Sequence, residues 1–137
     1  TIVERDNMRT AIKGLKAKRK LWYLPDHDYG LTHGLFAPLF GIQAATLYTT
    51  ARLATKTQAA IMPVSCIRLD GTKGYQFTVY PALKNFPVGD DLSDATTLNK
   101  KIEEMICLKP EQYLWAHRRF KNRPEGEEDV YNFSKPS

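Results

Sequence analysis

The order of elements along the chain predicts an α/β fold, a sheet flanked by helices. Helical and strand-like segments follow one another as helix–strand–helix–strand–strand–helix–helix. The 137 residues are 42% hydrophobic and 11% aromatic, which suits one globular domain and excludes a disordered chain. The sequence begins without Met, and its first residues already lead into a predicted helix. We therefore expect a piece of a longer protein, with a sheet that strands outside this sequence complete.

The first third of the chain predicts a helix, a strand and a loop. Apolar residues with helical spacing predict a helix over Met8–Ala17, with Asp6 as its N-cap. The apolar run Leu21–Leu24 predicts a buried strand that Pro25 ends. Residues 26–30 then form a loop after that strand.

The middle of the chain predicts one helix and a hairpin. Glycines and prolines make Leu31–Gln43 irregular, and small residues predict a helix over Ala44–Lys56. A second strand is expected over Ala59–Leu69. The turn sequence at 70–74 then joins it to a third strand over Tyr75–Tyr80.

The last third predicts two helices and a polar end. Apolar residues at helical spacing predict an amphipathic helix over Ala95–Leu108, following Asp94. Pro110 suits the first turn of a further helix over Glu111–Arg119. The polar remainder, 121–137, is expected to be extended or frayed.

Charge and length narrow the function classes. The net charge is +5, and the basic residues gather in 1–20 and 112–124. Nucleic acid, an anionic membrane face and a phosphorylated substrate are therefore all possible partners. No apolar run approaches the ~20 residues of a membrane span.

Cysteine and glycine patterns argue against several kinds of site. Cys66 and Cys107 lie in apolar surroundings without paired spacing, so we expect two buried thiols and no metal site. No phosphate-binding glycine loop and no Gly-x-Ser-x-Gly turn occurs. The apolar segment Phe36–Phe40 could line an acyl-chain pocket, but core packing is the favoured interpretation.

Two segments carry candidate chemistry. Asp26, His27 and Asp28 follow a predicted strand end, where α/β proteins gather functional groups. They could bind a metal, orient a catalytic His or hold a hydroxyl, and they could equally cap backbone amides. The second segment interleaves basic and aromatic residues, which suits phosphates or RNA, or a solvated helix end. Its polar members are His117, Arg118, Arg119, Lys121 and Arg123.

Three sequence blocks resemble the lipid A biosynthesis acyltransferases of Gram-negative bacteria, the lauroyl, myristoyl or palmitoleoyl type. The blocks are WYLPDHDYG at 22–30, FAPLF at 36–40 and PEQYLWAHRRFKNRPEG at 110–126. The resemblance runs from about residue 5 to residue 131. It implies that 1–124 is the C-terminal portion of one acyltransferase domain and 125–137 a polar tail. The implied fold is the C-terminal part of a glycerophosphate-acyltransferase-like mixed sheet flanked by helices.

The resemblance also implies a reaction and its partners. Family members move a fatty acyl group from acyl carrier protein to a hydroxyl of a phosphorylated lipid A precursor, with no cofactor beyond the acyl-carrier co-substrate. They act at the cytoplasmic face of the bacterial inner membrane. The resemblance thus predicts acyl carrier protein, the precursor and an anionic membrane surface as partners, and no nucleic acid.

The family's catalytic motif, a His followed five positions later by Glu or Asp, does not occur here. His27, His33 and His117 are followed at that offset by Thr32, Pro38 and Asn122 respectively. The resemblance therefore places the dyad and a membrane anchor upstream of Thr1. It also implies that this chain alone is inactive.

The resemblance carries over to particular residues. Asp26 matches the family's essential Asp and Asp28 its neighbour, so both are candidate catalytic residues. The candidate substrate-binding residues are Arg5, His117, Arg118, Arg119, Lys121 and Arg123, and no metal ligand is implied. Two alternatives remain: a non-catalytic domain that binds anionic lipid or nucleic acid, and a degenerate family member that never had the dyad. The basic segment lacks the aromatic strand pattern of an RNA-stacking platform.

Overall fold

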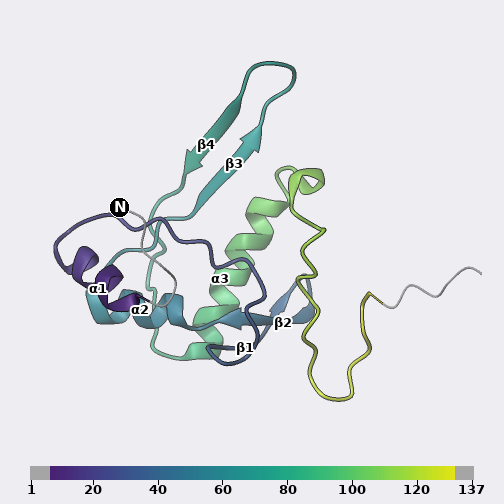
Figure 1. Ribbon diagram of the computed structural model, residues 1–137, viewed down its shortest axis with the longest axis horizontal. Helices are drawn as coiled ribbons and strands as arrows, with labels where there is room; N and C mark the ends of the chain where they lie inside the picture. Colours follow the sequence, from purple (N-terminus) through teal and green to yellow (C-terminus); the bar gives the residue numbers. More distant parts are fainter. Residues whose placement is uncertain (1–6, 132–137) are drawn as a thin grey trace, which may run out of the picture.

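A computed structural model describes residues 7–131, which contain three α-helices and two separate antiparallel hairpins (Figure 1). The elements in chain order are α1 (Met8–Lys16), β1 (Gly34–Leu39), β2 (Ile42–Leu47), α2 (Thr49–Thr57), β3 (Val64–Arg68), β4 (Tyr75–Val79), α3 (Asp91–Ile106) and the short 3-10 turn η1 (Pro110–Gln112). The α/β class is confirmed. The described strands form two two-stranded sheets rather than one mixed sheet.

The β1–β2 hairpin overturns two predictions, the irregular segment at Leu31–Gln43 and the helix that begins at Ala44. Leu39 pairs with Ile42 across a two-residue turn at Phe40 and Gly41, which have φ angles of 50° and 75°. Positive φ at both positions matches the twist of a tight hairpin. Ala44 and Ala45 are at most 1% exposed in β2, because a small side chain lets neighbouring elements approach closely. Tertiary packing has overridden their helix propensity, and α2 begins only at Thr49.

The main core lies between this hairpin, α3 and the C-terminal segment. Leu39 and Ala44 pack with Ile102 and Ile106 of α3, and Phe120 closes the cluster. Partly buried side chains surround it, among them Met105, Tyr113, Val130 and Tyr131. Ala37 and Leu39 are buried, so core packing is confirmed for this part of Phe36–Phe40.

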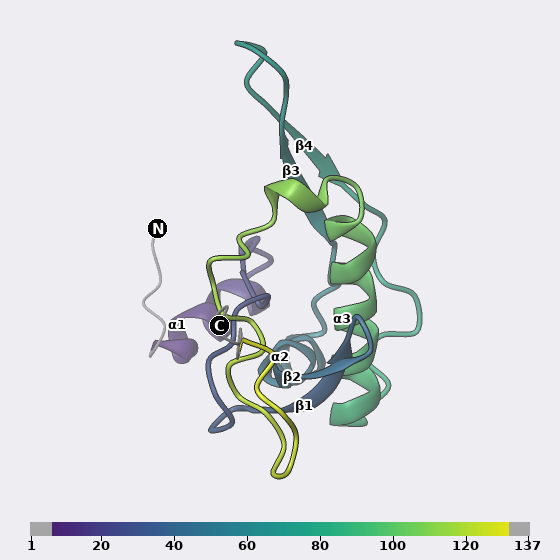
Figure 2. The same cartoon turned by 90° about the vertical axis from the view of Figure 1, so that its right-hand side faces the viewer.

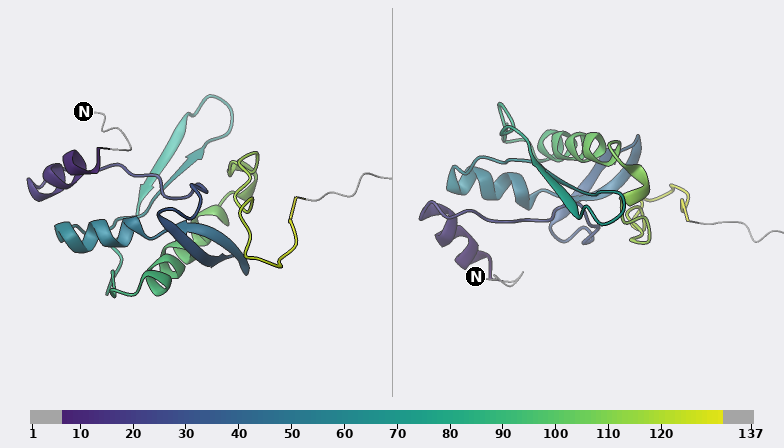
Figure 3. Two further views of the ribbon diagram at one scale, coloured as in Figure 1. Left: turned by 60° about the horizontal axis from the view of Figure 1, so that its bottom comes forward. Right: turned by 90° about the horizontal axis from the view of Figure 1, so that it is seen from above.

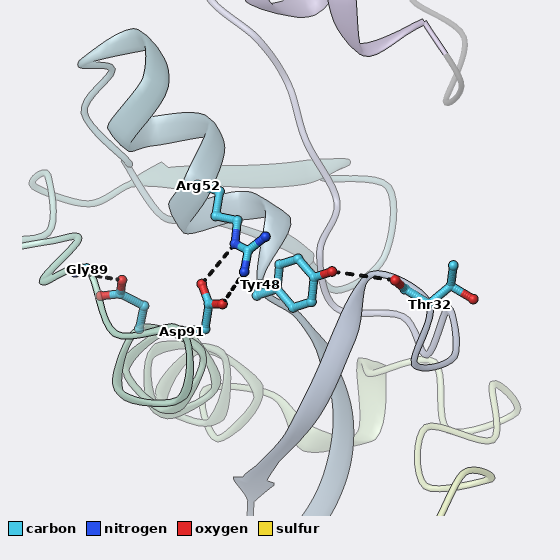
Figure 4. Close-up of polar contacts among 6 residues, drawn as sticks. Thr32, Tyr48, Arg52, Gly89 and Asp91 are labelled. Carbon is cyan, nitrogen blue, oxygen red and sulfur yellow. Dashed lines mark hydrogen bonds and ion pairs between the residues drawn. The ribbon is translucent and has the colours of Figure 1, made fainter.

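Helix α3 begins four residues before the predicted Ala95. Asp90 caps it by accepting from the Ser93 N–H at 2.8 Å. At the same end, Arg52 of α2 donates to both oxygens of Asp91, at 3.1 and 2.5 Å, and its guanidinium lies 4.1 Å from the Tyr48 ring centroid (Figure 4). These contacts hold the start of α3 against α2.

The N-terminal segment differs from its prediction at two points. The helix is capped by Asn7, whose side chain accepts from the Thr10 N–H at 3.2 Å, and the expected cap, Asp6, lies outside the described residues. Leu21–Leu24 is no strand: Trp22 and Leu24 are 62% and 58% exposed, and within the described residues no strand pairs with this segment. Figure 3 shows α1 lying beside α2, with the 19–30 segment crossing from there toward β1.

The β3–β4 hairpin confirms the predicted turn at 70–74 and the third strand, and places the second strand in the later part of its predicted range. The predicted helix at Glu111–Arg119 is wrong beyond η1, since residues 113–131 have no regular structure. The prediction of buried thiols is also wrong. Cys66 lies on the hairpin and Cys107 just after α3, and both are exposed.

A large apolar hollow separates the hairpin base from the helices. Its volume is about 740 Å³. Side chains of α1, α2 and α3, residues 18–26 and the hairpin line it, including Leu53, Ile61, Leu98 and Met105. The hollow borders Asp26 and Tyr113, which belong to the two candidate segments.

Candidate functional site

The two segments that carry the candidate residues meet through the buried carboxylate of Asp28. Asp28 is 3% exposed. Its Oδ1 accepts from the Gly30 N–H at 2.8 Å and from the Asn122 side-chain amide at 2.7 Å, and its Oδ2 accepts from the Asn122 N–H at 3.3 Å. Asn122 lies 94 positions after Asp28 in the sequence, so this carboxylate joins the 26–30 loop to the basic segment.

His117 completes the junction as a hydrogen-bond acceptor. Its Nε2 accepts from the Asp28 N–H at 2.9 Å, and its ring stacks on His27 with centroids 4.5 Å apart. An imidazole nitrogen that accepts must be unprotonated, so the neutral ring carries its proton on Nδ1. Burial first, and then the nearby charges of His27, Lys121 and Arg119, lower the pKa of His117 below 6.5, while Asp28 opposes them.

Acid is therefore expected to weaken this junction. The folded state holds His117 with a lowered pKa, so the unfolded chain binds the proton first as the pH falls below about 6.5. The stability that this group contributes is present above that pH and is lost as pH falls through the folded-state pKa. We expect the melting temperature to drop between about pH 7.5 and about pH 5.5.

The control for this prediction is the variant His117→Gln. Its side-chain oxygen can accept a hydrogen bond from the Asp28 N–H, and its side chain does not titrate. Its melting temperature should change less over the same pH range. An equal pH dependence in both proteins would show that other groups, and not His117, cause the loss.

Asp26 lies beside this junction but differs from Asp28 in its contacts. Its backbone carbonyl accepts from the Tyr113 hydroxyl at 3.4 Å. Within residues 7–131 no hydrogen bond or ion pair reaches its carboxylate, and the residue borders the hollow. The pKa of Tyr113 is raised, mainly by burial and then by the charge of Asp26. The structure thus leaves the Asp26 carboxylate available where the hollow begins.

Arg119 points into the protein rather than toward a ligand. It is 1% exposed, and its guanidinium donates to the Ala45 carbonyl at 2.7 Å and to Thr46 Oγ1 at 3.3 Å. Asn99 of α3 meets the same Thr46 Oγ1 at 2.9 Å and also donates to the Pro38 carbonyl at 3.0 Å. Burial lowers the pKa of Arg119 below the usual value of a guanidinium group. Arg119 therefore ties the basic segment to β2 from within.

The other basic residues divide into one internal and two exposed members. Arg123 donates to the Gln43 carbonyl at 2.6 Å and forms an ion pair with Glu127, so it holds the chain rather than presenting its charge. Arg118 and Lys121 are exposed, and the Arg118 guanidinium lies 5.1 Å from the Tyr131 ring centroid. Arg5 lies outside the described residues.

The sequence interpretation missed two participants. Asn122 supplies two of the three donors to Asp28, and Tyr113 donates to the loop that carries Asp26. Asn122 lies inside the basic block and Tyr113 just before it, but an amide and a phenol among so many cations carried no separate signal.

Two negative observations hold for the described part of the chain. Residues 7–131 contain no group of three or more His, Cys, Asp or Glu side chains placed to share a metal ion. None of the helices there is long and apolar enough to span a membrane.

Comparison with known proteins adds family information to this geometry. The family model described as bacterial lipid A biosynthesis acyltransferase matches residues 1–122. The chain is 42% identical over 127 residues to a lipid A biosynthesis lauroyltransferase of Escherichia coli K12. It is 38% identical over 131 residues to a palmitoleoyltransferase and 29% identical over 126 residues to a myristoyltransferase of the same organism. These alignments cover 92%, 95% and 92% of this chain but only 42%, 42% and 39% of the relatives.

Proposed function

The chain belongs to the bacterial lipid A biosynthesis acyltransferase family, and on that premise we propose that it is part of an enzyme that transfers a fatty acyl group from acyl carrier protein to a hydroxyl of a phosphorylated lipid A precursor. The observation that best supports this proposal is the Asp28 junction. It brings together two of the three sequence blocks that are characteristic of the family, although 89 positions separate Asp28 from His117. This portion of the fold would belong to a glycerophosphate-acyltransferase-like domain.

Acyl transfer to a hydroxyl needs a base for the hydroxyl proton and donors for the developing oxyanion. His117 is poorly placed as that base, because its Nε2 already accepts from the Asp28 N–H. His27 and His33 have no acidic residue at the family's offset. We infer that the base comes from the part of the longer protein that this chain does not span, and that this chain alone does not catalyse.

Asp26 is the residue of this chain proposed to act near the reaction. Its carboxylate has no hydrogen-bond partner within residues 7–131, whereas that of the neighbouring Asp28 has three donors. Asp26 would orient the catalytic base or the substrate hydroxyl and would not itself attack. Asp28 supports it by fixing the backbone of the same loop. On this view Asp26 is a positioning residue and Asp28 a structural one.

The test measures acyl transfer from acyl carrier protein to a lipid A precursor with the protein extended to the length of its relatives. Asp26→Asn is expected to lower kcat by about 10–100-fold, as for groups that orient a catalytic side chain. KM and the melting temperature should change little, and the pH profile of kcat should shift. Asp70→Asn, in the exposed β3–β4 turn, is the matched control and should keep full activity.

Near wild-type turnover of Asp26→Asn would contradict the role of Asp26. Turnover by the 137-residue chain alone would contradict the external base. A longer protein that folds but transfers no acyl group would favour the alternative, a non-catalytic domain that binds anionic lipid or nucleic acid.

Arg118 and Lys121 are proposed to contact the precursor's phosphates or an anionic inner-membrane surface on the cytoplasmic side. Both side chains are exposed, and Arg119 and Arg123 have internal partners. A second exposed basic stretch, Lys16–Lys20, would suit the acidic acyl carrier protein.

Reversing both charges, as Arg118→Glu with Lys121→Glu, should weaken binding of the chain to anionic vesicles by about 30-fold or more. Each basic residue near such a surface contributes about 1 kcal/mol. Vesicle sedimentation at low salt measures the change. Lys73→Glu with Lys84→Glu makes the same charge change at exposed sites elsewhere and should weaken binding less. Unchanged binding of the first variant at low salt would contradict the proposal.

A further inference from the structure

Tyr113 reaches the loop that carries Asp26 from a distant part of the sequence. In Figure 2 the segment that follows η1 descends beside residues 19–30. The Tyr113 hydroxyl donates to the Asp26 carbonyl across 87 positions of sequence. Within residues 7–131 this is the one hydrogen bond that Asp26 makes, its backbone groups included. Tyr113 is therefore the direct polar contact between Asp26 and the rest of the described chain.

The Asp28 junction supports a different part of the loop. Its hydrogen bonds involve the Asp28 N–H and carboxylate, the Gly30 N–H and groups of His117 and Asn122. None of them includes an atom of Asp26. Asp26 borders the apolar hollow, and Tyr113 borders it as well. The position of Asp26 at the edge of the hollow thus has its own support.

Packing, rather than the hydroxyl, holds the Tyr113 ring in place. The ring meets Trp115 edge-on, with centroids 4.9 Å apart and planes at 78°, and it lies against the main core cluster. Trp115 is itself anchored, because its Nε1 donates to the Pro110 carbonyl at 2.7 Å. A Phe ring has the same shape, so removing the hydroxyl alone should leave the ring where it is.

The Tyr113 phenol remains a hydrogen-bond donor at any pH where acyl transfer would be measured. Its pKa is raised above the usual value for tyrosine, mainly by burial and then by the charge of Asp26. The charge of Arg119 opposes this shift and Tyr131 adds to it. A raised pKa keeps the proton on the hydroxyl well above neutral pH.

The length of the contact also suits a group that serves a bound ligand. The two oxygens are 3.4 Å apart, whereas a well-formed O–H···O hydrogen bond is about 2.7–2.8 Å long. Hydrogen bonds at catalytic sites are often long without substrate and shorten when it binds. Because Asp26 and Tyr113 both border the hollow, a ligand there would lie against both residues.

We propose that Tyr113 is a positioning residue for acyl transfer, which holds Asp26 at the edge of the hollow so that its carboxylate can orient the catalytic base or the substrate hydroxyl. Tyr113 acts through the backbone of Asp26 and exchanges no proton with the substrate. The inference rests on the proposed function, because Tyr113 has this role only through Asp26. It gives the block at 110–126 a part in the reaction besides the contacts with anions proposed for Arg118 and Lys121.

The test compares four forms of the protein extended to the length of its relatives: the native protein, Tyr113→Phe, Asp26→Asn and the double variant. Acyl transfer from acyl carrier protein to a lipid A precursor gives kcat and KM separately. Tyr113→Phe should lower kcat about 10-fold, as for groups that orient a catalytic side chain, and leave KM within about two-fold. In the Asp26→Asn background the same substitution should have no further effect on kcat, because the carboxylate that Tyr113 positions is already lost.

Tyr48→Phe is the matched control. The Tyr48 hydroxyl also donates to a backbone carbonyl, that of Thr32, at 3.5 Å (Figure 4). Tyr48 is not among the described residues that border the hollow. Tyr48→Phe should keep full activity, and both single tyrosine variants should keep the native melting temperature. A melting temperature of Tyr113→Phe well below that of Tyr48→Phe would show that the hydroxyl is structural, and would overturn the inference.

Three kinetic results also overturn it. The first is a kcat of Tyr113→Phe equal to that of Tyr48→Phe. The second is an equal loss of kcat in the native and Asp26→Asn backgrounds, since Tyr113 would then act independently of Asp26. The third is a raised KM with unchanged kcat, which identifies Tyr113 as a substrate contact. Each of these leaves the proposed function intact, whereas full turnover by Asp26→Asn, or none by the native extended protein, contradicts the proposed function and this inference with it.

Discussion

Replacing Asp28 with alanine is expected to destabilise the protein by about 3 kcal/mol. The carboxylate is the acceptor for Gly30 N–H, Asn122 N–H and the Asn122 side-chain amide, in a site that is 3% exposed. Each buried donor left without an acceptor costs roughly 1–3 kcal/mol, and water entering the space would offset part of that total. Urea unfolding should show a lower midpoint with an unchanged slope.

Two further variants provide the comparison for the loss of stability in Asp28→Ala. Asp28→Asn keeps an oxygen for the two shorter hydrogen bonds, so its loss should be about 1 kcal/mol. Asp129→Ala removes an exposed carboxylate that, within residues 7–131, accepts only from the Tyr131 N–H, and it should cost less than about 1 kcal/mol. If Asp28→Ala were no more destabilised than Asp129→Ala, the carboxylate would not be what joins the two segments.

Replacing Arg119 with alanine should cost about 3–4 kcal/mol. The substitution removes two hydrogen bonds from a charged donor, to the Ala45 carbonyl and Thr46 Oγ1, and leaves a cavity beside β2. The substitution also removes the desolvation cost of burying a cation, whose Nε has no acceptor in the described structure. We expect the lost hydrogen bonds and packing to exceed that gain, because the guanidinium also faces the charges of Asp26 and Asp28.

The variant Arg119→Met separates the two contributions. Methionine restores much of the buried volume but donates no hydrogen bond, so we expect a loss of about 2 kcal/mol by urea unfolding. Arg118→Ala, next in sequence and exposed, should change stability by less than about 0.5 kcal/mol. If Arg119→Met were as stable as the native protein, the side-chain volume and not the guanidinium would be the stabilising feature.

Local patterns predicted those elements whose stabilising contacts are near in sequence. The turn at 70–74 predicted the β3–β4 hairpin, since a tight turn depends on the residues within it. The apolar spacing of α3 predicted five inward positions, of which Leu98, Ile102 and Ile106 are buried and Met105 is partly buried. The prediction for Leu108 was wrong, since it lies just past the helix and is 49% exposed. The predicted start of α3, just after Asp94, was late, because the cap is Asp90 and Asp94 lies inside the helix, where it accepts from Val88 and Gly89 N–H groups in the preceding loop.

For the candidate site too, the sequence predicted some features and only the tertiary structure decided others. The sequence identified the 26–30 loop and the basic segment as candidates, and its resemblance identified the family, which the comparisons confirm. It could not distinguish Arg118 from Arg119, which have the same chemistry and adjacent positions. Only the path of the chain past β2 buries one guanidinium and leaves the other exposed.

The sequence by itself therefore determined the α/β class, the second hairpin, the amphipathic face of α3 and the family. The tertiary structure decided that Ala44 and Ala45 belong to a strand, that His117 is an acceptor for the Asp28 backbone, and that both cysteines are exposed. The physical reason is the range of the interactions. Propensity, turns and periodicity act within a few residues, whereas burial and the choice of hydrogen-bond partner depend on segments as much as 94 positions apart.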